Sequence, residues 1–100
     1  MKIFSLSTLR RYWEKFPECE QSLKAWHDEV RRAVWASPHD IRDRFASASF
    51  VGNTRVVFNI KGNSHRLVVD VSYQRQMVYI KFIGRHADYD RIDVSTVERK

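Results

Sequence analysis

The C-terminal half of this sequence concentrates side-chain types that could cleave an RNA phosphodiester bond. They are Lys61, Arg66, Lys81, Arg85, His86 and Tyr89. In such a reaction a base removes the proton of a ribose 2′-hydroxyl, which attacks the adjacent phosphate, and an acid protonates the departing 5′-oxygen. Histidine or tyrosine can transfer these protons, and arginine or lysine can stabilise the charge that builds on phosphorus. This chemistry needs no metal ion and predicts RNA as the substrate, because DNA lacks the 2′-hydroxyl.

Three predicted strands between residues 55 and 86 position these side chains. Their apolar residues alternate with other types, and successive side chains of a strand point to opposite faces of a sheet. We expect helices to cover the apolar face, formed by Val56, Phe58, Ile60, Leu67, Val69, Val71, Val78, Ile80 and Phe82. The other face should stay open, with the single acid Asp70 among the cations Arg55, Lys61, Arg66, Arg75, Lys81 and Arg85. Because this face holds most of the formal net charge of +6, we predict that it attracts polyanions, with RNA as the leading candidate.

The rest of the chain predicts the elements that support these strands. Residues 2–6 suit a short strand, and apolar residues at helical spacing then predict two helices, separated near Pro17 and ending before Pro38. Residues 46–50 favour another strand, and residues 87–97 a short closing helix. This order predicts one α+β domain over residues 1–100, in which an N-terminal strand and a helical hairpin pack on one face of a small, mostly antiparallel, twisted sheet.

Composition narrows the class of protein. With 43% apolar residues and 100 residues in all, the chain can form a single core. Its one cysteine, Cys19, cannot form an internal disulfide, which fits a reducing compartment. No apolar run approaches the roughly 20 residues of a membrane span, and no secretion signal is visible. We therefore expect a soluble, cytoplasmic protein without a membrane partner.

Metal and cofactor sites are not expected. The single cysteine and the histidines do not have the spacing of a zinc motif. The four histidines are His27, His39, His65 and His86. No cluster of acidic residues suggests magnesium, and three glycines are too few for a phosphate-binding loop.

Each candidate residue also has a structural interpretation. Arg55 and Arg75 could be solvated surface charges, and Lys61 and Lys81 could serve only solubility. Arg66 lies on the same face as Asp70 and could pair with it.

The candidates with rings have similar alternatives. His86 follows the parity of the apolar face unless Gly84 breaks the alternation, so a structural role is open. His65, beside the predicted Gly62-Asn63 turn, is typical of a surface position. Tyr89 could anchor the closing helix by packing.

Several segments of the C-terminal half resemble the HigB family of toxins from bacterial toxin–antitoxin pairs. They are residues 57–63 (VFNIKGN), 66–69 (RLVV), Tyr73, 78–84 (VYIKFIG) and 86–93 (HADYDRID). The similarity is close over residues 50–93 and weak over the helical half. It implies a RelE-like fold and an endoribonuclease that cuts messenger RNA on the translating ribosome. It also implies a helix-turn-helix, HigA-like antitoxin that neutralises the toxin and binds operator DNA with it.

The resemblance also implies roles for particular residues. Lys61 and Arg66 would handle the phosphate, and His86 and Tyr89 would transfer protons or orient a base. Further RNA contacts are predicted for Lys81, Arg85, Arg55, Arg75 and His65. Three positions depart from the family pattern: His65 replaces the usual aromatic residue, Asp70 a neutral or basic one, and Arg85 a smaller polar one. The codon preference and the identity of the acid and the base stay open.

Two other functions fit the charge and the sheet pattern. A noncatalytic RNA- or DNA-binding regulatory module would use the same cations for phosphate contacts alone. A protein-interaction domain would use them to bind an acidic partner.

Overall fold

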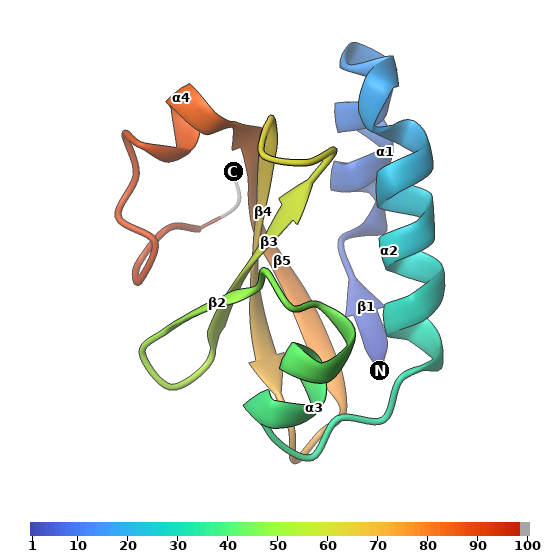
Figure 1. Ribbon diagram of the computed structural model, residues 1–100, viewed down its shortest axis with the longest axis vertical. Coiled ribbons are helices and arrows are strands. Elements are labelled where there is room, and N and C mark those ends of the chain that lie inside the picture. The colour runs from blue at the N-terminus through green and yellow to red at the C-terminus, as the bar shows by residue number, and fades with distance from the viewer. Residues whose placement is uncertain (99–100) are drawn as a thin grey trace.

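A computed structural model describes residues 1–98 of the chain (Figure 1). The elements follow one another as β1 (Lys2–Phe4), α1 (Leu6–Lys15), the 3-10 turn η1 (Pro17–Cys19), α2 (Glu20–Arg32), α3 (Pro38–Arg44), β2 (Ser49–Val51), β3 (Arg55–Ile60), β4 (His65–Ser72), β5 (Met77–Arg85) and α4 (His86–Tyr89).

The five strands form one sheet in the order β1-β5-β4-β3-β2. β1 runs parallel to β5, and the other neighbouring pairs are antiparallel. Figure 1 shows α1 and α2 side by side on one face of this sheet, while α4 and the chain that follows it lie on the opposite side. The predicted α+β class and the N-terminal strand with its helical hairpin are therefore confirmed.

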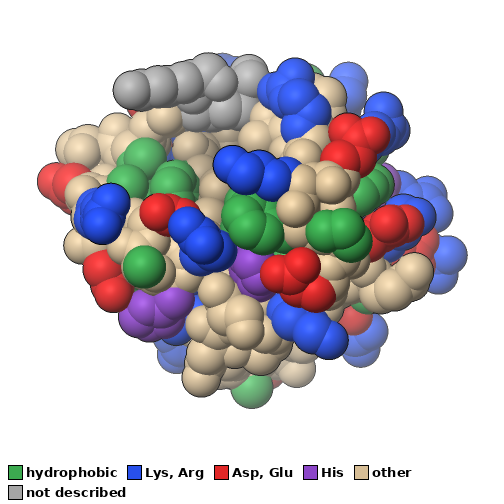
Figure 2. Space-filling model, turned by 90° about the horizontal axis from the view of Figure 1, so that it is seen from above, with side chains coloured by type: hydrophobic (Ala, Val, Ile, Leu, Met, Phe, Trp, Pro, Cys, Tyr) green, Lys and Arg blue, Asp and Glu red, His purple; other side chains and the backbone are tan. Residues whose placement is uncertain are grey.

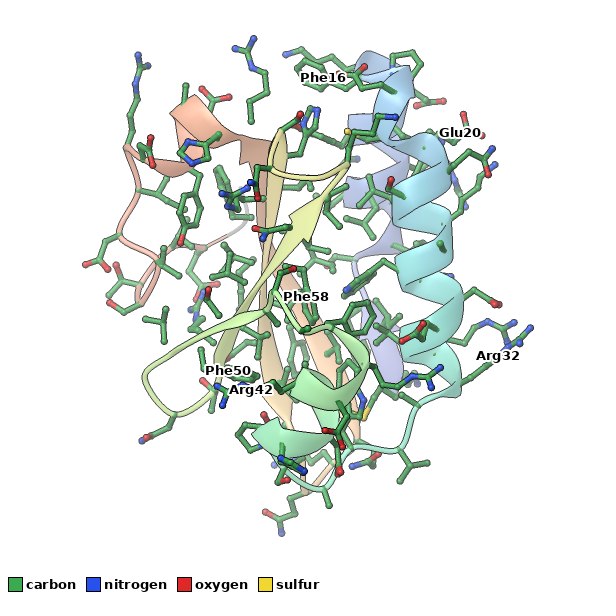
Figure 3. All side chains as sticks on the ribbon, in the orientation of Figure 1. Phe16, Glu20, Arg32, Arg42, Phe50 and Phe58 are labelled. Carbon is green, nitrogen blue, oxygen red and sulfur yellow. The ribbon has the colours of Figure 1, made fainter. Side chains whose placement is uncertain are left out.

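Apolar side chains at helical spacing fix the two long helices on the sheet. α1 buries Leu9, and α2 buries Leu23, Trp26 and Val30, which recur at steps of three and four residues. The ring of Phe58 extends from β3 into this layer and meets Trp26 edge-on, with centroids 5.5 Å apart (Figure 3). Burial of these side chains stabilises the packing of the hairpin on β3, β4 and β5.

Three predicted boundaries are wrong. The helical spacing of Val30, Ala33 and Val34 predicts that the second helix continues through Val34. α2 instead ends at Arg32, and Val34 is 82% exposed. The second strand begins only at Ser49, after Phe45 has ended α3. The predicted closing helix over residues 87–97 is a single turn, His86–Tyr89, because turns and bends follow it.

A β-bulge changes the predicted alternation in β5. Val68 pairs with Phe82, whereas the next residue, Val69, pairs with Ile80, so Lys81 is the extra residue on β5. Phe82 therefore shares the face of Val68 instead of the helix-covered face, and Ile83 packs against the main core. The prediction for Phe82 is wrong because the bulge reverses the parity of every residue after it.

The second face of the sheet is also covered along part of its length. Val57 and Val68 are buried although they stand outside the main core cluster, and the Arg55 side chain is only 10% exposed. The segment after α4 returns over this face, where the Val97 carbonyl accepts a hydrogen bond from Arg55. The expectation of a fully open basic face is thus wrong, because the predicted closing helix is instead an irregular strap on this face.

Candidate active site

Arg66, His86 and Tyr89 come together at the end of the sheet where β4 begins and β5 ends. The guanidinium carbon of Arg66 lies 5.8 Å from the centroid of the Tyr89 ring. The ring centroids of His86 and Tyr89 are 6.5 Å apart, with the ring planes at 60°. His86 and Tyr89 begin and end the single turn of α4, and side chains three positions apart share one side of a helix.

Backbone contacts fix this grouping. Arg66 lies opposite Gly84 in the β4–β5 ladder, and the chain leaves the sheet two residues later. The backbone N–H of His86 donates to the Ser64 carbonyl at 3.1 Å, and Nη1 of Arg66 donates to the Asn63 carbonyl at 2.9 Å. Both contacts reach the β3–β4 turn, so the turn holds the histidine and the arginine in place together.

Gly84 allows α4 to approach the sheet closely. A Cβ atom at this position would lie 2.5 Å from Cζ of Phe82 and 3.4 Å from Cβ of Asp88. A larger residue would therefore displace the Phe82 ring beside the site. The alternation breaks at the Lys81 bulge and not at Gly84, which pairs with Arg66 in regular register, so the expectation that Gly84 interrupts it before His86 is wrong.

The charges around the cluster are mixed. Nδ1 of His86 lies 3.2 Å from an Asp90 carboxylate oxygen, and Nε of Arg85 lies 3.5 Å from Asp88. The His86 side chain is 51% exposed, so solvent reaches the imidazole and screens this pair. Figure 2, which looks onto this end of the molecule, shows acidic side chains interspersed among the lysines and arginines. The end of the sheet is therefore not the almost purely basic surface that was predicted.

Arg66 keeps its guanidinium available for a ligand. Among residues 1–98 its hydrogen bonds go to the Asn63 and His65 carbonyls, and it forms no ion pair. The alternative in which it pairs with Asp70 is wrong, because Asp70 lies beside Arg55 at 3.8 Å.

Lys61 lies on the other side of the β3–β4 turn. It follows β3 with a positive φ of 54° and lines a shallow hollow with Ser22, Ala25 and Trp26 of α2. Within the described chain it makes no contact with the ring of His86 or Tyr89. The turn thus brings Lys61 near the cluster along the chain but directs it toward α2.

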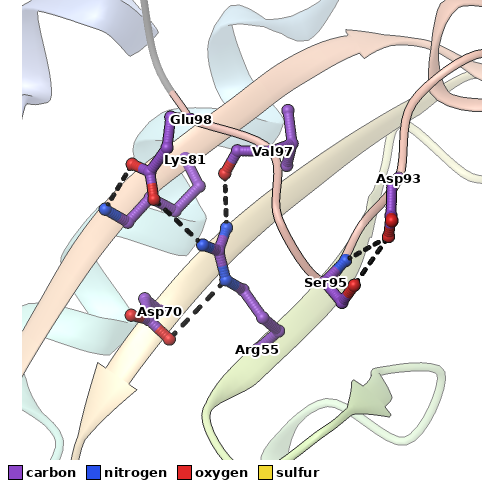
Figure 4. A network of polar contacts seen from close by, with 7 residues as sticks. All are labelled: Arg55, Asp70, Lys81, Asp93, Ser95, Val97 and Glu98. Atoms are coloured by element: carbon purple, nitrogen blue, oxygen red, sulfur yellow. Dashed lines mark hydrogen bonds and ion pairs between the residues drawn. The ribbon is translucent and has the colours of Figure 1, made fainter.

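Arg55 and Lys81 hold the C-terminal strap. Arg55 donates to the Val97 carbonyl at 2.7 Å and to Glu98 at 3.2 Å, and Lys81 donates to Glu98 at 2.8 Å (Figure 4). The hydrogen bond from Lys81 lowers the pKa of the Glu98 carboxyl, with a further contribution from Arg55. Arg55 was expected on an open RNA-binding face, and that placement is wrong because the strap buries it.

Arg75 and Arg85 lie apart from the cluster for different reasons. Arg75 is in the β4–β5 turn, at the opposite end of β4 from Arg66. Ser72 lies six positions after Arg66 along β4, a distance of roughly 20 Å at about 3.3 Å per residue. Arg85 precedes His86, but its guanidinium lies over the Phe16 ring at the end of α1, 5.6 Å from the centroid.

His65 is not at the surface. It is 2% exposed, its Nδ1 lies 2.7 Å from the Tyr12 hydroxyl, and its Nε2 lies 3.3 Å from a Glu18 carboxylate oxygen. The expectation of a surface histidine that contacts RNA is wrong in its placement. The cluster of Glu18, Cys19 and His65 was not predictable from the sequence, because these residues come from η1 and β4 and share no local motif.

None of the helices within residues 1–98 has the length and apolar character needed to cross a bilayer.

Comparisons with known proteins point to one family. The profile of a family described as "HigB_toxin, RelE-like toxic component of a toxin-antitoxin system" matches residues 19–92. The "mRNA interferase toxin HigB" of Escherichia coli (strain K12) is 26% identical over 92 residues, which cover 90% of this chain and 88% of that protein. The "mRNA interferase HigB" of Shigella flexneri aligns with the same figures. An "mRNA interferase HigB" of Escherichia coli O6:H1 is 21% identical over 94 residues, or 92% of this chain and 91% of the relative. These alignments span the helical half as well as the sheet.

Proposed function

The chain belongs to the HigB family of RelE-like toxins and is an endoribonuclease of the mRNA interferase kind, and from this premise we propose how and where it acts. It cleaves messenger RNA on the translating ribosome, by attack of a ribose 2′-hydroxyl on the adjacent phosphate. The reaction uses side chains of the protein alone.

The observation that carries this proposal is the convergence of Arg66, His86 and Tyr89 beside an exposed edge of the fold. Their separations of 5.8 and 6.5 Å suit one phosphodiester bridging the side chains through hydrogen bonds of about 2.7–3.0 Å. Arg66 contributes a guanidinium that stabilises the negative charge of the transition state. His86 transfers a proton, and its exposed imidazole can reach an RNA chain that approaches from solvent.

Tyr89 can support the reaction in three ways. Its face already lies under the Arg66 guanidinium, so it orients this cation by a cation–π contact. An RNA base could stack on the ring, and its hydroxyl could share the proton transfer with His86. Of the His86 imidazole and the Tyr89 hydroxyl, the group that faces the 2′-hydroxyl acts as the base and the other acts as the acid.

Other cations guide the RNA chain. Lys61 and Arg85 lie outside the cluster, against α2 and over Phe16 of the α1 end, and would contact phosphates further along the RNA chain. Lys81 could join them by exchanging Glu98 for a phosphate, since this ion pair is partly exposed. Arg75 lies too far from the cluster to touch the same short RNA segment.

A toxin of this family has an antitoxin as its partner. We expect a HigA-like protein with a helix-turn-helix domain, which neutralises the toxin and binds operator DNA together with it. The toxin then acts in the cytoplasm, where translating ribosomes are found.

Mapping of messenger RNA ends after brief expression tests the proposal. The wild-type protein should arrest growth and produce new ends inside reading frames. Arg66→Ala should produce neither, although it should fold as well as the wild type. Arg75→Ala, the matched loss of an arginine at the far end of the sheet, should remain fully toxic. Toxicity of Arg66→Ala equal to the wild type would contradict the site, and growth arrest without any cleavage would favour a noncatalytic RNA-binding module.

A further inference from the structure

A second group of chemically active side chains lies on the helix side of the sheet, behind the proposed nuclease site. Glu18 and Cys19 belong to η1, between α1 and α2, and His65 is the first residue of β4. Their nearest ligand atoms, a carboxylate oxygen, Sγ and an imidazole nitrogen, all lie within 4.8 Å of one another. The proposed cleavage reaction uses none of the three.

The three donors match the ligands that zinc prefers. Zn²⁺ binds thiolate, imidazole and carboxylate at about 2.0–2.3 Å, which places tetrahedral ligand atoms roughly 3.3–3.8 Å from each other. Nε2 of His65 and Oε2 of Glu18 are 3.3 Å apart, already within this range. A contraction of about an ångström at most would bring the remaining pairs of the set into it.

Burial of the ligands differs in a way that suits ion entry. Cys19 is completely buried and His65 is 2% exposed, so both are held by the core. The Glu18 side chain is 49% exposed and can move toward an incoming ion. The fourth coordination position would face solvent on the Glu18 side, which leaves room for a water molecule.

A further contact orients the imidazole for this role. The Tyr12 hydroxyl lies 2.7 Å from Nδ1 of His65. When Nδ1–H donates to this oxygen, the lone pair of Nε2 points toward Glu18 and Cys19. The rings of Tyr12 and Phe16 pack against the imidazole, with centroids 5.5 and 5.6 Å away, and restrict its rotation. Zinc-bound histidines characteristically have such a partner on the second nitrogen.

We propose that Glu18, Cys19 and His65 form a Zn²⁺ site that fastens η1 to the start of β4. On binding, the ion replaces the thiol proton of Cys19, which is released to solvent. The imidazole proton moves from Nε2, where it faces Glu18 in the ion-free form, to Nδ1, where the Tyr12 oxygen accepts its hydrogen bond. No oxidation or reduction occurs. The ion acts on the fold: it links the α1–α2 connection to the residue directly before Arg66. Without the ion, the Tyr12–His65–Glu18 hydrogen bonds make a weaker form of the same link.

Titration of the full chain with Co²⁺, as a spectroscopic substitute for Zn²⁺, tests this proposal. We expect one equivalent to bind, with a thiolate-to-cobalt charge-transfer band and the strong visible bands of tetrahedral cobalt. Zn²⁺ added afterwards should abolish both. Cys19→Ala should lose the charge-transfer band, and Glu18→Gln, a change at an exposed position, should weaken Co²⁺ affinity at least about tenfold.

Two further variants separate a built site from adventitious binding. His39→Gln alters a histidine that is exposed on α3 and should bind Co²⁺ as the wild type does. Tyr12→Phe keeps all three ligands and should weaken affinity roughly 10- to 100-fold through the loss of orientation. Circular dichroism of each variant verifies its fold. Absence of a thiolate band in the wild type, or equal affinity of the wild type and Glu18→Gln, would overturn the proposal and leave the cluster as a hydrogen-bonded link.

Discussion

The Tyr12 hydroxyl and Nδ1 of His65 lie 2.7 Å apart, and this contact joins α1 to the first residue of β4. The next residue of β4 is Arg66, whose guanidinium lies over Tyr89. The helical hairpin thus supports the site from behind, although neither α1 nor α2 contributes a side chain to the Arg66–His86–Tyr89 cluster. Support of this kind keeps a reactive arginine on a rigid strand end.

Tyr12→Phe should lower the free energy of unfolding by about 1–3 kcal/mol, because the almost fully buried His65 loses a hydrogen-bond partner. Urea unfolding in the presence of a chelator measures this effect apart from any metal binding. Tyr73→Phe is the control, since the Tyr73 hydroxyl makes no hydrogen bond within residues 1–98, and it should change stability by less than about 0.5 kcal/mol. Equal losses in the two variants would show that the Tyr12 contact is unimportant.

Arg55→Ala should release the C-terminal strap. The change removes the hydrogen bonds to Val97 and Glu98 and leaves the buried Oδ1 of Asp70 without its neighbouring cation. We expect a loss of about 2 kcal/mol in the free energy of unfolding, below the range for a fully buried pair because Asp70 and Glu98 are partly exposed. Limited proteolysis should then cleave the variant near its C-terminus faster than the wild type. Arg75→Ala, a change in the β4–β5 turn, should leave both measurements unchanged.

Attachment of the strap should depend on pH. Hydrogen bonding by Lys81 lowers the pKa of Glu98 below its ordinary value of 4.5. A carboxyl with a lowered pKa in the folded state stabilises that state above its ordinary pKa, and the contribution disappears as the pH falls through the lowered value. The strap should thus be attached at neutral pH and should loosen below about pH 4.5. The amide resonance of Val97, followed by NMR against pH, reports this change, and Glu98→Gln should abolish the transition. A transition of the same size in Glu98→Gln would assign it to another group.

Sequence periodicity predicted the helix-covered face of the sheet well, because side-chain parity is a local property of a strand. Leu67, Val69 and Val78 are all buried in the core, as expected. Parity failed after Lys81, since a bulge depends on pairing with β4 and leaves no local signal. The same applies to the strap, which Arg55 holds through contacts more than 40 positions away in the chain.

The candidate site was predictable to a similar degree. The residue types grouped three further cations with Arg66, His86 and Tyr89, and the structure brings only these three named residues together. The other cations lie elsewhere: Lys61 against α2, Lys81 on Glu98 and Arg85 over Phe16. His65 could not be assigned from sequence, because its burial depends on Tyr12 and Glu18 of distant segments.

His86→Ala should reduce cleavage by about 10²- to 10⁴-fold, the usual contribution of a general acid or base. Its stability should stay within about 0.5 kcal/mol of the wild type, because the side chain is half exposed and its pair with Asp90 is screened. Single-turnover cleavage of a ribosome-bound message measures the rate, and chemical denaturation measures the stability. His39→Gln is the control for the loss of an exposed histidine. An unchanged rate in His86→Ala would remove this residue from the mechanism.

Cleavage of a ribosome-bound message that carries a single 2′-deoxynucleotide at the mapped cleavage position tests the central claim most directly. The account predicts that the unmodified message is cut and yields a 2′,3′-cyclic phosphate, since the 2′-oxygen is the attacking group. It also predicts that the deoxy-substituted message stays intact at that position. Cleavage of the deoxy-substituted message at an undiminished rate would contradict the mechanism.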